Sequence, residues 1–454
     1  MISRAVLAAF WLGIQSVGGG SAVTQAIVAI WPSYEHIPNH LPPSARITTR
    51  DMASYVIFHA VQFPFLLIPM HRLQTLFLVK TIVTVPMAVG MLIWICEKAH
   101  NSNAILHQPA TLSGSSRAWA WLASLTSITG GFSSLAVNIP DFSRFSKNEQ
   151  AQLWQAPIIP ALKIVTALFG IVATGAARIV YGQDLWSPLD LIAKWTGGGG
   201  RFLAFICSVI WIVTQICANM SANLVSFAND VTTMCPKWMN ITRGTILCAL
   251  IGGFAFVPWI IMVSATSFMS FMSGYAIFLA PMAGLLTCDY WILRRAKYDV
   301  PGLYDPHGRY RYVVCSQIMF LARLPDVIYF LLSHANIVSQ AGVNWRAVVV
   351  MVVVLTPLLP GLANAVSPST VRLGAGILNL YNINWLYAFH ATIFLYWILN
   401  YVSPPRETFV SATIPGLPEE ASIIEGIEGG TGSTEMDHEA KVPAKDVSVT
   451  GQEY

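Results

Sequence analysis

The sequence predicts an all-α integral membrane protein whose chain crosses the bilayer many times. Hydrophobic residues make up 55% of its 454 residues and charged residues only 11%, less than half the roughly 25% found in soluble domains. Several uncharged apolar runs approach or exceed the ~20 residues that a helix needs to cross a bilayer. The chain has 15 tryptophans, and tryptophan is enriched at both membrane–water interfaces.

Eleven apolar runs follow one another along the chain, and ten of them are predicted to span the membrane. The run at 313–334 is excluded, because Arg323 and Asp326 flank Pro325 at its centre. Each charge at mid-bilayer costs about 2.5–3.5 kcal/mol. The predicted spans lie at about 5–31, 53–70, 73–96, 118–139, 158–182, 202–228, 244–264, 266–292, 347–366 and 383–402.

Helix-interrupting residues occur at four places inside these spans. They are Pro86, the pair Gly130–Gly131, Pro258, and Pro281 with Gly284. Such residues are tolerated in a membrane where the backbone lines a cavity or packs closely. A kinked helix explains any one of them equally well, but several together favour a transporter with broken helices.

Basic residues predict the side of the membrane that each loop occupies. The loop at 293–311 carries five of them, whereas the loops at 32–52, 98–117 and 183–201 carry two each. Since cytoplasmic loops are enriched in lysine and arginine, we expect the basic loops and the C-terminal tail to be cytoplasmic. The expected location is the plasma membrane.

Composition divides the chain into a transporter domain, 1–402, and an acidic tail, 403–454. The tail holds ten acidic residues against three basic ones and is rich in glycine, serine and proline, so it is expected to be disordered. Trafficking or ubiquitination machinery is its expected partner. The seven cysteines show no C-x-x-C spacing, which indicates packing residues and no metal site.

Two polar pairs with helical i, i+4 spacing interrupt the apolar spans, Trp11 with Gln15 and Asn219 with Asn223. An indole offers a stacking face, and a carboxamide offers a donor and an acceptor together. These groups complement the imide or amide edge of a nucleobase-like ring. In the alternative interpretation, the carboxamides bridge neighbouring helices.

The two pairs are predicted to lie at the same depth. Arg4 marks the cytoplasmic end of the first span, and Asp230 marks that of the span at 202–228. At about 1.5 Å per residue, Gln15 and Asn219 each lie about 16 Å from these ends. Both pairs are therefore expected near the middle of the membrane.

Motifs along the chain resemble nucleobase–cation symporter family 1, specifically its fungal uracil/allantoin permease branch. The likeness covers about 1–402 apart from 313–340. The motifs that carry it are "FWLGIQ" (10–15), "TGGFSSLAVNIPDFSRF" (129–145), "NMSANL" (219–224), "GYAIFLAPMAGLLTCDYWILRR" (274–295), "GVNWRA" (342–347) and "YNIN" (381–384).

The resemblance implies a leucine-transporter-like bundle with two inverted five-helix repeats and two further helices. Substrate would bind between discontinuous helices one and six and helices three and eight. The substrate-binding residues that it implies are Trp11 and Gln15 from helix three, Gly131 and Phe132 from the break in helix six, and Asn219 and Asn223 from helix eight. Asn223 matches the family's principal asparagine, so Asn219 is expected to matter less.

The expected activity is proton-coupled import of a small heterocycle, without a cofactor and without nucleic acid. Cys217 and Ala218 stand where sodium-coupled relatives have small hydroxyl residues, a departure that suits proton coupling. Uracil, uridine, allantoin, hydantoin, thiamine and nicotinamide riboside all stay open as substrates. The alternative is a non-transporting receptor or an inactive fragment of such a permease. An enzyme is not expected, because H-E-x-x-H, G-x-S-x-G and clustered Cys/His motifs are absent from the sequence.

Two irregularities follow from the resemblance. The family has twelve helices and this chain begins at the third, so a truncated protein or gene model is expected. In the family, the equivalent of "GRYRY" leads almost directly into "GVNWRA", whereas about thirty residues intervene here. The atypical insert at 313–340 is therefore interpreted as a retained intron rather than a helix.

Overall fold

The computed structural model describes residues 2–68, 70–100, 102–106, 111–143, 150, 153–303, 305, 308–310, 344–367, 370–405 and 408–415. Two compact units make up the chain. The first is Met1–Asp289 with Arg346–Val402, and the second is Tyr290–Trp345 with Ser403–Tyr454. The insert at 313–340 lies outside the described residues, so its interpretation stays a prediction.

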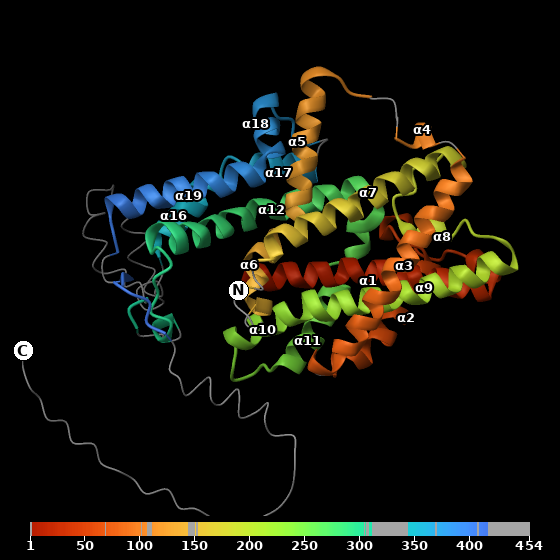
Figure 1. The fold of residues 1–454 in the computed structure, drawn as a ribbon, viewed down its shortest axis with the longest axis horizontal. Helices are drawn as coiled ribbons and strands as arrows, with labels where there is room; N and C mark the ends of the chain where they lie inside the picture. Colours follow the sequence, from red (N-terminus) through yellow and green to blue (C-terminus); the bar gives the residue numbers. More distant parts are fainter. Residues whose placement is uncertain are drawn as a thin grey trace, which may run out of the picture. The chain divides into compact units, whose positions relative to one another are not determined.

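Helices occupy each of the ten ranges predicted to span the membrane (Figure 1). Their bounds are α1 Ile2–Ile30, α2 Thr49–Leu66, α3 Gln74–Ala99, α5 Gly114–Gly131, α6 Ser133–Ser143, α7 Gln155–Tyr181, α9 Gly197–Ala218, η5 Asn219–Leu224, α10 Val225–Met234, α11 Ile241–Leu250, η6 Ile251–Ala255, α12 Ala265–Thr287, η8 Cys288–Leu293, α16 Trp345–Leu355, α17 Leu359–Val366 and α19 Asn384–Val402. Helix α18, Ala375–Asn382, lies between the last two predicted ranges. Short helices connect them: η1 Pro32–His36, η2 Pro43–Ala45, η3 Met70–Leu73, α4 Ser102–Leu106, α8 Pro188–Ile192, η7 Pro258–Val263 and η9 Pro301–Leu303.

Six of the described helical stretches are long and apolar enough to cross a membrane, and a bent pair, α16 with α17, makes a seventh. The stretch Ile241–Ala255 is too short for that measure, and α2 and α19 are not among the seven, so the full number of ten spans stays a prediction. Helix α7 turns apolar side chains outward, with Ile164 61% and Ile171 64% exposed. An apolar surface of this extent suits lipid rather than water, which supports an integral membrane protein.

Helix α1 forms the centre of the first unit. It packs along α9, while α12 packs along α19 (Figure 1). At one end of α1, Nε of Arg4 donates to Oδ2 of Asp230 on α10 at 2.8 Å, and this carboxylate is only 2% exposed. The ion pair fixes the register of α1 against α9 and α10. The contact agrees with the matching depths predicted for the two polar pairs, whose place in the membrane stays a prediction.

The predicted interruptions are confirmed at two of the four places. Helix α5 ends at Gly131, and α6 starts at Ser133. A Cβ atom on Gly130 would lie 2.9 Å from the carbonyl oxygen of Met272, so the glycine allows α5 to approach α12 closely.

The second confirmed break corrects the predicted span at 244–264. Its helical part ends at Ala255, and Val257 adopts a left-handed φ of 48° directly before Pro258. Proline cannot donate the backbone hydrogen bond that would continue the helix, and it restricts the residue before it. A short 3₁₀ helix, η7, follows instead.

At the other two places the structure favours the alternative interpretation, a proline within an unbroken helix. Pro86 and Pro281 lie within the continuous helices α3 and α12, because a membrane helix tolerates a single missing hydrogen bond. Gly284 serves packing: a Cβ atom there would lie 2.8 Å from the carbonyl oxygen of Phe389 on α19.

The second unit includes the first residues of the predicted tail. The backbone N–H of Val300 donates to the carbonyl of Ile414 at 3.0 Å, and that of Ile414 donates to Tyr298 at 2.9 Å. Nη2 of Arg294 donates to Oγ1 of Thr408 at 3.3 Å. Residues 408–415 are thus held in place, which moves the expected start of the disordered tail beyond the predicted Ser403. Residues 416–454 lie outside the described part.

Candidate functional site

A cavity of about 410 Å³ lies among α1, the α5–α6 break, α7, the α9–η5 segment and α12. This volume falls in the range of ligand sites, about 300–1,000 Å³. Five of the six predicted site residues line it: Trp11, Gln15, Gly131, Phe132 and Asn223. They come from three segments far apart in the sequence. The fold therefore brings together residues that the sequence motifs had suggested for one common site.

The α1 wall presents an indole and a carboxamide one helical turn apart. The Trp11 ring packs edge-on against Phe268, with centroids 5.9 Å apart and planes at 88°, and against Tyr275 at 6.3 Å. These α12 rings fix the orientation of the indole. Gln15 is half-buried, and its carboxamide has no hydrogen-bond partner among the described residues. That carboxamide is therefore available to a ligand.

The break between α5 and α6 supplies the second aromatic face. Gly131 ends α5, and Phe132 adopts φ −105° and ψ 0° at the junction. A Cβ atom on Gly131 would lie 2.8 Å from the terminal methyl group of Met272. The glycine therefore keeps this wall of the cavity open, and the Phe132 ring borders the space beyond it.

A wide π-helical turn, η5, carries the asparagine pair. Such turns insert one extra residue into an α-helix and often occur at functional sites. Nδ2 of Asn223 donates to Oδ1 of Asn219 at 3.0 Å, and Nδ2 of Asn219 donates to Oε1 of Gln62 at 2.7 Å. Asn219 also donates to Oγ of Ser16 at 3.2 Å. This relay fixes the Asn223 amide and leaves its Oδ1 to accept from a ligand.

The structure places Asn219 behind the cavity wall rather than in it. This residue is fully buried, and protein groups occupy both ends of its amide. Asn219 was expected to contact the substrate, and the structure corrects this. Its side chain instead positions Asn223, because the hydrogen bonds that hold the Asn223 amide pass through Asn219.

Replacing Gln62 by leucine should weaken ligand binding about tenfold. The change removes the 2.7 Å acceptor of Asn219, and a buried donor left without its partner costs about 1–3 kcal/mol. Asn219 can then turn and release Asn223. The measurement is competitive binding on purified protein, with the unfolding temperature recorded in parallel.

Ser16→Ala is the matched control, because it removes only the longer 3.2 Å contact to Asn219. Its effect on affinity should be smaller. Equal affinities for Gln62→Leu and the unaltered protein would show that the relay does not position Asn223.

Three residues around this site were missed by sequence reasoning: Gln62, Asn138 and Lys163. Asn138 lines the cavity and is 7% exposed; its Nδ2 donates to Oγ of Ser226 at 3.2 Å, and its Oδ1 has no partner among the described residues. Each of the three polar side chains lies inside an apolar run, and this was the available signal.

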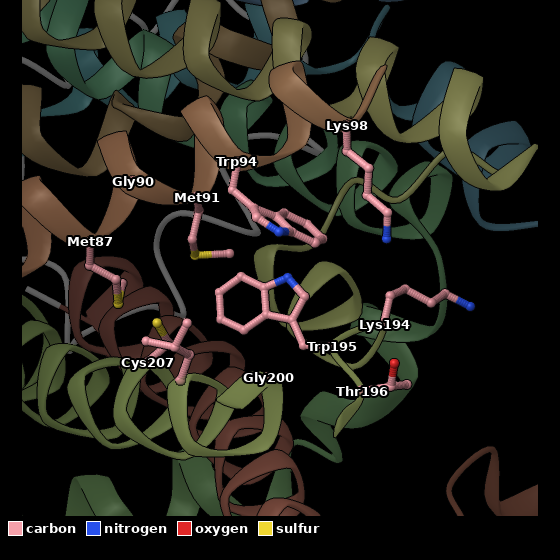
Figure 2. A pocket seen from close by; sticks show the side chains of 11 residues that line it. Met87, Gly90, Met91, Trp94, Lys98, Lys194, Trp195, Thr196, Gly200 and Cys207 are labelled. Atoms are coloured by element: carbon pink, nitrogen blue, oxygen red, sulfur yellow. The ribbon is translucent and has the colours of Figure 1, made fainter. Parts of the chain in front are cut away.

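Two larger cavities lack this combination of groups. One, of about 810 Å³, lies between α1, η7, α12 and α17 and is lined mostly by apolar side chains such as Phe10 and Phe271. The other, of about 470 Å³, lies between α3 and α9 (Figure 2). There the Trp94 and Trp195 rings stand edge to face at 5.2 Å, beside Lys98 and Lys194. Neither offers a carboxamide to the imide edge of a ring.

A bundle of apolar helices, one of them broken beside a polar and aromatic cavity, is the architecture of a membrane transporter. The chain belongs to the family of permeases for cytosine/purines, uracil, thiamine and allantoin, whose sequence profile matches residues 1–322. This confirms the resemblance to nucleobase–cation symporter family 1.

Curated relatives agree with the family. A permease of Schizosaccharomyces pombe is 33% identical over 94% of this chain and 71% of its own length. The uracil permease and the allantoin permease of Saccharomyces cerevisiae are each 31% identical over 92% of this chain. The chain spans only 62% of the length of these two permeases.

The fold matches that of the solved transporter Mhp1. A structure of this nucleobase-cation-symport-1 family transporter, closed and with bromovinylhydantoin bound, superposes with a TM-score of 0.61 at 20% sequence identity. The match covers 90% of this chain and 76% of the other. The predicted all-α, leucine-transporter-like fold is therefore confirmed.

Proposed function

We propose that this protein is a proton-coupled symporter that imports a small heterocycle such as uracil or allantoin. The observation that carries the proposal is the cavity, in which three carboxamides and three aromatic rings meet. A flat ring can stack against Trp11 and Phe132 while its imide edge bonds to Gln15 and Asn223. With Nδ2 of Asn223 donating to Asn219, Oδ1 can accept from a ring N–H and Gln15 can donate to a ring carbonyl.

The proposed substrate contacts are Trp11, Gln15, Gly131, Phe132 and Asn223. Proton coupling is supported by Cys217, which is 1% exposed and stands with Ala218 directly before Asn219. A thiol and a methyl group are poor ligands for sodium, which prefers oxygen atoms. We further propose a plasma-membrane location, with the basic loops and the tail in the cytoplasm and the tail open to trafficking or ubiquitination machinery.

Binding and uptake together test this proposal. The purified 454-residue chain should bind radiolabelled uracil or allantoin saturably, and unlabelled heterocycles should compete. Cells that express the chain should accumulate the same ligand faster when the outside is acidic, and a protonophore should abolish the accumulation. A chain that binds neither ligand contradicts the proposal. Binding without accumulation would instead favour a receptor or an inactive fragment.

A further inference from the structure

One ammonium group borders the cavity. Lys163 lines it from α7, and every other described residue that lines it is uncharged. Within α7, Lys163 is the only charged residue between Gln155 and Arg178. Because an ionisable group inside a membrane-spanning segment is costly, its presence there indicates a function.

The surroundings of Lys163 leave its ammonium group available. Nζ lies 4.4 Å from the centre of the Phe132 ring. In the described ranges of the chain, no carboxylate pairs with it and no side chain accepts a hydrogen bond from it. A ring face attracts a cation but carries no negative charge that would neutralise it. The three N–H groups of Lys163 therefore remain available to an anionic acceptor.

The face of α7 that carries Lys163 is open. Residues three, four and seven positions further on share a helix face with it, and these are Thr166, Ala167 and Gly170. The bulky residues Leu162, Ile164 and Leu168 lie on the other sides of the helix. These three residues are exposed and do not line the cavity, so Lys163 is the one described residue of α7 that reaches it.

Building on the proposed function, we infer that Lys163 makes the cavity selective for heterocycles that carry an anionic substituent, such as a ring carboxylate. The rings would stack on the heterocycle, the carboxamides would hold its imide edge, and the ammonium would donate to the carboxylate. Hydrogen bonds between charged partners are about twice as strong as those between neutral ones. In the competing explanation Lys163 only extends toward the membrane surface, since it lies about 12 Å from the start of α7.

Three ligands of nearly equal shape separate these explanations: uracil, uracil 6-carboxylate and uracil 6-carboxamide. Their affinities are measured on the purified full chain by competition with radiolabelled uracil. The unaltered protein should bind the carboxylate about tenfold or more tightly than the carboxamide. Lys163→Gln should remove this preference and leave uracil affinity within about threefold, whereas Lys163→Arg, which keeps the charge, should retain the preference.

Lys80→Gln is the matched control, because Lys80 lies on the spanning helix α3 and outside the cavity lining. It should leave all three affinities unchanged. An unaltered protein without the preference, or a Lys163→Gln variant that keeps it, overturns the inference while uracil binding upholds the proposed function. If no ligand binds to the unaltered chain, both fail.

Discussion

Replacing Asp230 by asparagine should lower the free energy of unfolding by about 3–5 kcal/mol, the range for breaking a buried ion pair on one side. The Asp230 carboxylate is 2% exposed and the Arg4 side chain 14%. The variant therefore removes the carboxylate charge of Asp230 from beside the Arg4 guanidinium in a largely dry environment. Denaturant titration of the purified protein in detergent measures the loss.

An exposed ion pair supplies the control. Arg178 and Asp184 lie 3.6 Å apart with side chains 56% and 63% exposed, and exposed pairs contribute about 0–1 kcal/mol. Asp184→Asn should therefore change stability little. A loss of under about 1 kcal/mol for Asp230→Asn would show that the pair does not hold α1 against α10.

Removing any one of three cavity side chains should weaken substrate binding by about tenfold or more. Trp11→Ala removes a stacking face worth about 0.5–1.5 kcal/mol beyond its buried area. Gln15→Ala and Asn223→Ala leave the polar edge of the ring without partners, at about 1–3 kcal/mol each. Competitive binding, normalised to the amount of folded protein, measures the effect.

Packing residues should respond differently. Leu12, one position from Trp11 on the buried side of α1, is 0% exposed. Leu12→Ala should lower protein abundance and leave the affinity of the surviving molecules unchanged. Unchanged affinity in all three cavity variants would mean that the carboxamides only join helices and that substrate binds elsewhere.

The parts of the site that were predicted depend on short-range patterns. Trp11 and Gln15 share one helix, so their spacing alone places them on one wall. Similarly, the Gly130–Gly131 pair predicts a break beside Phe132 because glycine weakens a helix locally. For Pro86 and Pro281 the sequence left a break and a kink equally open, since the surrounding helix, and not the proline alone, decides whether the chain breaks.

The parts that were missed depend on contacts between distant segments. Gln62 reaches Asn219 across 157 positions of the chain, and no local pattern predicts that hydrogen bond. Lys163 lies 31 positions after Phe132 in sequence, yet its ammonium group lies over that ring. The separate roles of Asn219 and Asn223 depend on the π-helical turn, whereas a regular helix was assumed for both.

That wide turn has a consequence for changes in chain length. Loss of the Ser221 codon would remove the extra residue and let η5 close into a regular helix. Helix α10 would keep its orientation, so Asp230 would still meet Arg4 and the protein would still fold. Asn223, however, would then stand three positions after Asn219 instead of four, which would disrupt the hydrogen bond that fixes its amide. We therefore expect this in-frame deletion to yield a protein that is stable and inserted in the membrane but no longer binds its ligand.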